Sequence, residues 1–60
     1  MNATEAKRRV LAVYPAAFAA QVGQWCYVYS RVHIENIGKG PTKDEAWIAA
    51  AAGLEERNER

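Results

Sequence analysis

The first apolar pattern in the chain has the spacing of a helix. Apolar residues recur at helical intervals around Val10, and charged residues fall mainly on the other side. Asn2 can cap the first turn, with Glu5 three residues later as its reciprocal partner. Pro15 disfavours helical geometry in the residue before it. The pattern predicts a helix over residues 3–14.

The next pattern predicts a β-hairpin with strands over 17–22 and 25–30. Aromatic and β-branched residues dominate the second strand, as is typical of a pleated, half-buried surface. Gly23 can adopt the positive φ that a two-residue type II′ turn needs at its first position. This turn places Val22 opposite Trp25. It also places Ala20 opposite Tyr27 and Phe18 opposite Tyr29, all on one side of the hairpin.

Residues 30–37 leave two options open. Either a short third strand lies near 32–38, or the second strand continues to Ile34 and turns at Glu35-Asn36. Which face of the hairpin forms the core is also undecided. The large burial area of the aromatic rings favours the face of Trp25, and the unbroken apolar alternation favours the face of Cys26. We expect the face with the large aromatic rings to be the core.

A second helix is predicted over 42–56, after a turn rich in helix breakers at 38–41. Thr42 and Glu45 have the spacing of a capping box. Trp47 begins an apolar stripe that continues through Ala50, Ala51 and Leu54 and should pack against Phe18, Val22, Trp25 and Tyr29.

The fold class predicted from these elements is α+β. The order is helix, two- or three-stranded antiparallel sheet, helix, and both helices lie on one sheet face because so short a chain can bury only one face. The chain should form a single domain over 1–60. We expect its core to come from Val10, Leu11, Val13, Tyr14, Phe18, Val22, Trp25, Tyr27, Val28, Tyr29, Ile34, Ile37, Trp47, Ile48 and Leu54.

The composition of the chain limits the classes of function that it can have. The net charge is +1, far from the basic footprint of a committed nucleic-acid binder. Cys26 is the only cysteine, so neither an internal disulfide nor a cysteine-based zinc cluster can form. A lone thiol suits a reducing compartment, and the chain has no long apolar run or signal peptide. We expect a cytoplasmic protein that does not bind membranes.

The segment from Gly38 to Ala51 resembles the C-terminal signature of the double-stranded-RNA-binding domain, G-x-G-x-S-K-K-x-A-K-x-x-A-A. The matching positions are Gly38, Gly40, Thr42, Lys43, Ala46, Ala50 and Ala51. The resemblance implies a helix, a three-stranded sheet and a helix, with phosphate held by lysines at the start of the last helix. Asp44 and Trp47 stand where the family has two of those lysines.

The chain is also similar to short uncharacterised proteins of phages and prophages. The shared features are Tyr14-Pro15, the aromatic strand 25–29, and the glycine-containing turn at 38–42 that leads to Ala46-Trp47. This resemblance implies no particular activity.

No catalytic, metal or cofactor site is predicted. Cys26 and His33 could form a nucleophile–base pair, but strand alternation places them on opposite faces, and no acid is placed to orient the histidine. Cys26 is best interpreted as a small buried apolar residue and His33 as a surface strand residue. We therefore expect that the chain is not an enzyme.

Two binding hypotheses follow. The first is a protein-interaction module, working with a protein partner or as a homodimer, that uses the sheet face left open by the helices. The aromatic strand could alternatively be a stacking platform for single-stranded nucleic acid. The second hypothesis is weak, non-specific binding of nucleic acid, which we consider the less favoured of the two. Its candidate residues are Lys7, Arg8, Arg9, Lys39 and Lys43.

Overall fold

The computed structural model describes the backbone of residues 1–58 and the side chains of residues 1–54. Its elements follow the order helix, sheet, helix, and the fold is α+β. They are α1 (Ala3–Val13), β1 (Phe18–Val22), β2 (Trp25–Tyr29), β3 (Gly38–Gly40) and α2 (Lys43–Asn58). The three strands form one antiparallel sheet in the order β1-β2-β3.

Both helices begin at the caps that the sequence predicts. The Asn2 side chain accepts a hydrogen bond from the Glu5 amide at 2.8 Å, and Thr42 Oγ1 accepts one from the Glu45 amide at 3.2 Å. The carboxylate of Glu5, expected as the reciprocal partner of Asn2, pairs instead with Arg9 one turn later, at 3.0 Å. Each cap satisfies an amide that a helix start leaves without a partner.

The hairpin has the predicted register. Val22 lies opposite Trp25 across a two-residue turn, and Phe18 lies opposite Tyr29 at the other end. Gly23 has φ +64°, as the first position of a type II′ turn requires. A Cβ added at Gly23 would meet nothing within 4 Å, so only its backbone conformation calls for glycine.

The third strand differs from both options left open by the sequence. Residues 31–36 form a loop, and the segment expected to be a turn is strand β3, which pairs with residues 26–28 of β2. The expectation of a turn rested on the glycines and the proline in this segment, which are typical of turns and are also disfavoured in strands. Contact with α2 overrides that propensity, because Gly38 and Gly40 lie directly against the helix backbone.

The approach of β3 to α2 is too close for any side chain on these two glycines. A Cβ on Gly38 would lie 2.5 Å from the Ala50 amide nitrogen and 2.6 Å from the Ala46 carbonyl oxygen. A Cβ on Gly40 would lie 2.8 Å from the Cβ of Glu45. Backbone atoms of a helix cannot move aside as a flexible side chain can, so both positions require glycine.

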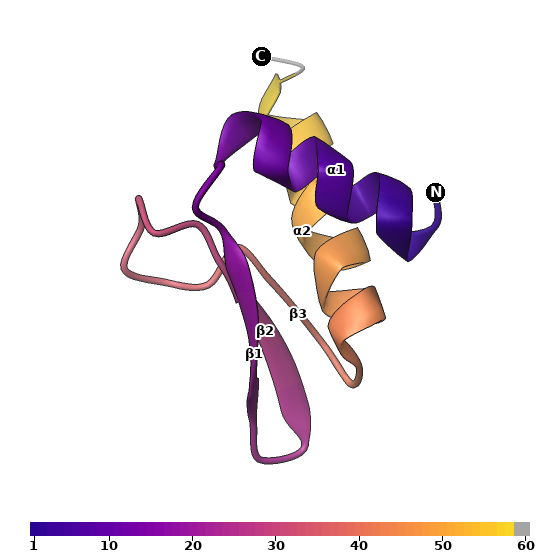
Figure 1. Ribbon diagram of the computed structural model, residues 1–60, viewed down its shortest axis with the longest axis vertical. Helices are drawn as coiled ribbons and strands as arrows, with labels where there is room; N and C mark the ends of the chain where they lie inside the picture. The colour runs from indigo at the N-terminus through magenta and orange to yellow at the C-terminus, as the bar shows by residue number, and fades with distance from the viewer. Residues whose placement is uncertain (59–60) are drawn as a thin grey trace.

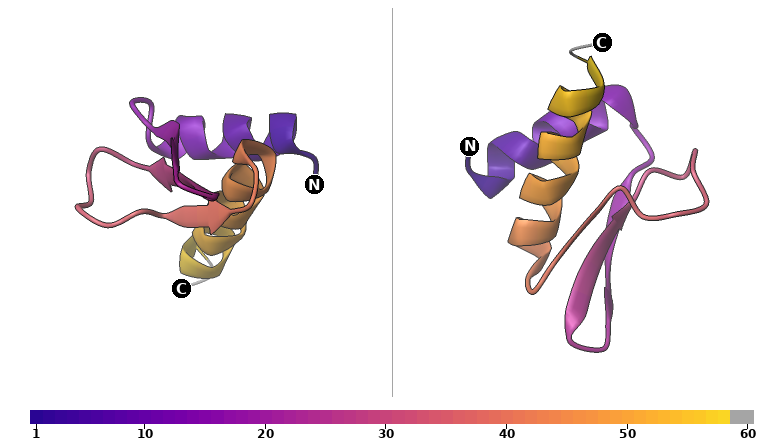
Figure 2. Two further views of the ribbon diagram at one scale, coloured as in Figure 1. Left: turned by 90° about the horizontal axis from the view of Figure 1, so that it is seen from below. Right: turned by 180° about the vertical axis from the view of Figure 1, so that it is seen from behind.

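The two helices lie on the same side of the sheet (Figures 1 and 2). Helix α2 covers the face that we call the inner face, and α1 packs across α2. One buried cluster joins them: Ala6 and Val10 from α1, Cys26 and Val28 from β2, and Ala46, Trp47, Ala50, Ala51 and Leu54 from α2.

The expectation that the aromatic face forms the core is wrong. Trp47, Ala50, Ala51 and Leu54 are buried as expected, but they pack with Cys26 and Val28 on the inner face. The cause is the short distance between α2 and the sheet. On the inner face, strand β2 therefore has room only for small side chains such as Cys26 and Val28. Five residues expected in the core are exposed instead: Val13, Phe18, Val22, Trp25 and Ile34.

The glycine contact gives a stability prediction. Gly38→Ala should lower the free energy of unfolding by about 1–3 kcal/mol or more, because the new methyl group must displace helix backbone. Gly53→Ala is the matched control: it lies inside α2, where an added Cβ comes no closer than 3.8 Å to Ile37. It should stabilise the fold by up to about 1 kcal/mol through helix propensity. Denaturant unfolding measures both, and a Gly38→Ala variant as stable as the wild type would contradict the contact.

Candidate interaction face of the sheet

The surface that we call the outer face is the side of the sheet turned away from both helices. The register of β1 and β2 places their large side chains there, and Lys39 joins them because it pairs with Tyr27. Its residues are Phe18, Ala20, Val22, Trp25, Tyr27, Tyr29 and Lys39.

Aromatic rings form a connected row on the outer face. Phe18 and Tyr29 stack across the two strands with centroids 5.4 Å apart, and Tyr27 lies 6.3 Å from Tyr29 along β2. Phe18, Val22 and Trp25 are among the exposed large apolar residues, Trp25 with 45% of its surface accessible. Contiguous apolar surface of this kind marks binding sites more often than isolated exposed residues do.

Two cations lie over rings of this face. The Arg31 guanidinium carbon is 4.5 Å from the centroid of Phe18, and Lys39 Nζ is 5.1 Å from that of Trp25. Both distances are within the range of cation–π attraction. Phe18 and Trp25 lie at opposite ends of the hairpin, so the outer face carries one positive charge near each end.

The loop after β2 begins with a buried serine that sequence reasoning missed. Ser30 is 1% exposed, and its Oγ accepts hydrogen bonds from the amides of Val32 at 3.1 Å and His33 at 2.9 Å. The same Oγ lies 3.0 Å from His33 Nδ1. The available signal was a serine at a strand end, since its hydroxyl can cap the amides two and three residues ahead.

These hydrogen bonds explain the Ser30–His33 pair as a structural feature that closes the loop. A serine nucleophile needs an accessible hydroxyl, whereas the hydroxyl of Ser30 is buried and closes the loop. The His33 ring also packs edge-on against Tyr14, with centroids 5.6 Å apart. Cys26 is buried on the inner face, and His33 is exposed in the loop.

Arg31 directly follows Ser30 and adopts φ +66°, the only left-handed backbone conformation among the described non-glycine residues. Such a conformation costs roughly 1–2 kcal/mol in a residue with a Cβ. The strained residue is the one whose guanidinium lies over Phe18. Local strain of this kind is often found at functional sites.

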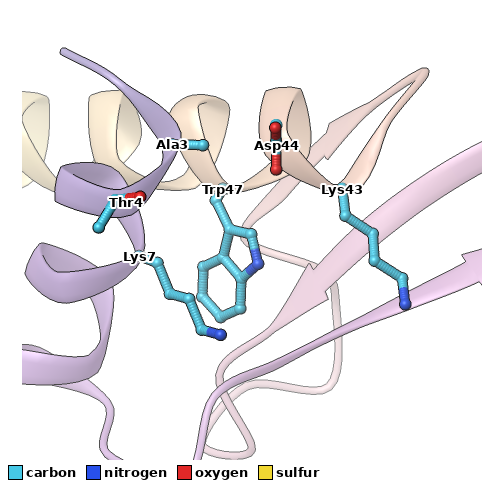
Figure 3. Close-up of a pocket in the computed structure, with 6 residues that line it drawn as sticks. All are labelled: Ala3, Thr4, Lys7, Lys43, Asp44 and Trp47. Carbon is cyan, nitrogen blue, oxygen red and sulfur yellow. The ribbon is translucent and has the colours of Figure 1, made fainter.

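The predicted nucleic-acid residues are divided between different surfaces. Lys7 and Lys43 line an open pocket of about 320 Å³ between the first turns of α1 and α2. Figure 3 shows the Trp47 indole between these two lysines; Lys7 Nζ is 5.7 Å from the ring centroid. Asp44 lines the same pocket. Arg8 is exposed on α1, Arg9 pairs with Glu5, and Lys39 belongs to the outer face.

Among the side chains of residues 1–54, no group of three or more His, Cys, Asp or Glu could hold a metal ion. Neither of the two described helices combines the length and apolar character needed to cross a membrane.

Comparison with protein-family models, with curated proteins and with solved structures found no significant match. The resemblances to the double-stranded-RNA-binding domain and to phage proteins therefore stay predictions. The class that the structure defines is a small α+β domain with an uncovered aromatic sheet face.

The two tryptophans test the division into inner and outer faces. Trp47, 6% exposed, belongs to the core, and Trp47→Ala should cost about 3–5 kcal/mol, close to the whole stability of so small a domain. Trp25→Ala is the matched control on the outer face and should cost less than about 1 kcal/mol. Thermal unfolding followed by circular dichroism measures both. Equal losses from the two variants would contradict this assignment of faces.

Proposed function

We propose that the chain is a non-enzymatic protein-interaction module whose binding surface is the outer face. The observation that supports this most directly is where the large side chains lie. Among the described residues, four of the nine in the core are alanine and one, Trp47, is aromatic, whereas a phenylalanine, a second tryptophan and two tyrosines belong to the outer face. A chain selected only to fold alone gains more from burying its largest rings, because burial area sets the hydrophobic free energy.

The residue types on and beside this face support a protein partner. Tryptophan, tyrosine and arginine are the residues most enriched at the energetic centres of protein interfaces. Trp25, Tyr27, Tyr29 and Arg31 fall within seven consecutive positions and belong to this surface or lie against it. The strain at Arg31 is consistent with a side chain held in place for binding rather than for stability.

Weak, non-specific binding of nucleic acid is the second candidate. Its support is the shared pocket of Lys7 and Lys43, which the first turns of both helices line. The Asp44 carboxylate in that pocket would repel a phosphate. On the outer face, Arg31 and Lys39 already lie over the rings of Phe18 and Trp25, where a base would have to stack. These features favour the protein-interaction proposal.

A cytoplasmic location completes the proposal. The thiol of Cys26 is free and buried in the core, where it acts as a small apolar side chain. Such a thiol suits a reducing compartment.

Site-specific photo-crosslinking tests the protein-interaction proposal in the cells that naturally produce the chain. Benzoylphenylalanine replaces Val22 on the outer face, and replaces Arg8 on the exposed side of α1 as the matched control. We expect a discrete adduct from position 22 that is sensitive to protease and resistant to nuclease. Mass spectrometry should identify one protein in that adduct, and position 8 should not yield it. A nuclease-sensitive adduct, equal yields from both positions or no adduct would contradict the proposal.

A further inference from the structure

The charges around the outer face restrict what can cover it. Strands β1, β2 and β3 contain no aspartate or glutamate, whereas Lys39 lies on the face and Arg31 lies over it. Two copies of the chain packed face to face would bring four cations together with no acid on the strands of either copy. Like charges in a desolvated interface oppose association, so charge disfavours a second copy and favours an acidic partner.

The dimensions of the face suit one helix. Strands of five residues are about 17 Å long, and three strands span about 10 Å across the sheet. An α-helix is about 10 Å in diameter, and three turns are about 16 Å long. A helix lying on this face would also complete a layer that the fold lacks, with helices on both sides of the sheet.

The two cations define where the acids of such a helix should lie. Arg31 lies over Phe18 beside Tyr29, and Lys39 lies over Trp25, four residues away from Tyr29 along β2. Four strand residues span about 13 Å, which corresponds to between two and three turns of a helix. Along this length, the face offers Val22, Tyr27 and Tyr29 to an apolar stripe.

From this geometry we infer that the partner presents an amphipathic helix of about three turns, with an apolar stripe flanked by acidic residues two to three turns apart. The inference rests on the proposed function and specifies the chemistry of the partner. Cation–π contacts leave the donor groups of Arg31 and Lys39 able to pair with a carboxylate, so the rings and the cations can act together.

The experiment uses three probes and maps their binding by amide chemical shifts of the full chain. The first probe is a designed 18-residue amphipathic peptide with leucines along one face and glutamates beside them. The second is the same peptide with every glutamate replaced by lysine, and the third is single-stranded oligothymidine. The chain variants are Lys39→Glu and Arg31→Glu. The control is Lys7→Glu, which changes the charge by the same amount at a lysine that lies over the ring of Trp47 rather than over a ring of the outer face.

We expect the acidic peptide to shift the amides of residues 18–31, and its affinity to fall about tenfold in Lys39→Glu and in Arg31→Glu. Lys7→Glu should bind it like the wild type. The basic peptide should bind weakly to the wild type and gain affinity for Lys39→Glu.

Every other outcome overturns the inference. Equal or stronger binding of the basic peptide would contradict the acidic partner while leaving a protein-binding face intact. Binding of oligothymidine alone to the outer face would contradict the proposed function as well. Concentration-dependent self-association through residues 18–31 would show that a second copy is the occupant. No binding by either peptide would reject the amphipathic acidic helix.

Discussion

The backbone contact between β3 and α2 constrains the rest of the structure. Gly38 and Gly40 present only hydrogen atoms to the helix, and α2 presents alanine at positions 46 and 50. With no side chain between them, strand and helix approach to a distance at which a single methyl group would clash. Helix α2 therefore lies close to the sheet, and the neighbouring strand β2 must also present small side chains to it.

This constraint explains the distribution of side chains over the sheet. Cys26 and Val28 fit beneath α2, whereas Trp25, Tyr27 and Tyr29 alternate with them and lie on the outer face. Because alternation along a strand is strict, one close helix contact decides the direction of every ring in the hairpin. The result is a small, alanine-rich core on one side and the largest rings of the sheet, with two cations over them, on the other. The core and the proposed binding surface thus lie on opposite faces of the same strands.

Local signals in the sequence predicted much of the fold. The caps at Asn2 and Thr42, the turn at Gly23 and the register of the hairpin all depend on residues within a few positions of one another. The aromatic strand was considered as a stacking platform, but the weight given to ring area favoured placing it in the core. The residues on both faces of β2 are apolar, so the pattern within the strand does not indicate which face forms the core.

The features that sequence missed depend on contacts between distant segments. Two glycines in three residues are typical of a turn, and only the helix that packs on them makes that segment a strand. Arg31 lies over Phe18, thirteen positions earlier in the chain, and it belongs to the loop that the hydrogen bonds of Ser30 close. Such contacts follow from the tertiary fold, which propensity and periodicity do not encode.

Nuclear Overhauser contacts in the isotope-labelled chain test this arrangement of faces most directly. The close approach of β3 and α2 predicts strong contacts from the Gly38 α-protons to the amide of Ala50 and to Ala46, and none from the ring protons of Trp25 or Tyr27 to side chains of α2. Contacts from those rings to Ala50 or Leu54, with none from Gly38 to the helix, would show that the aromatic face is the core and would contradict the constraint.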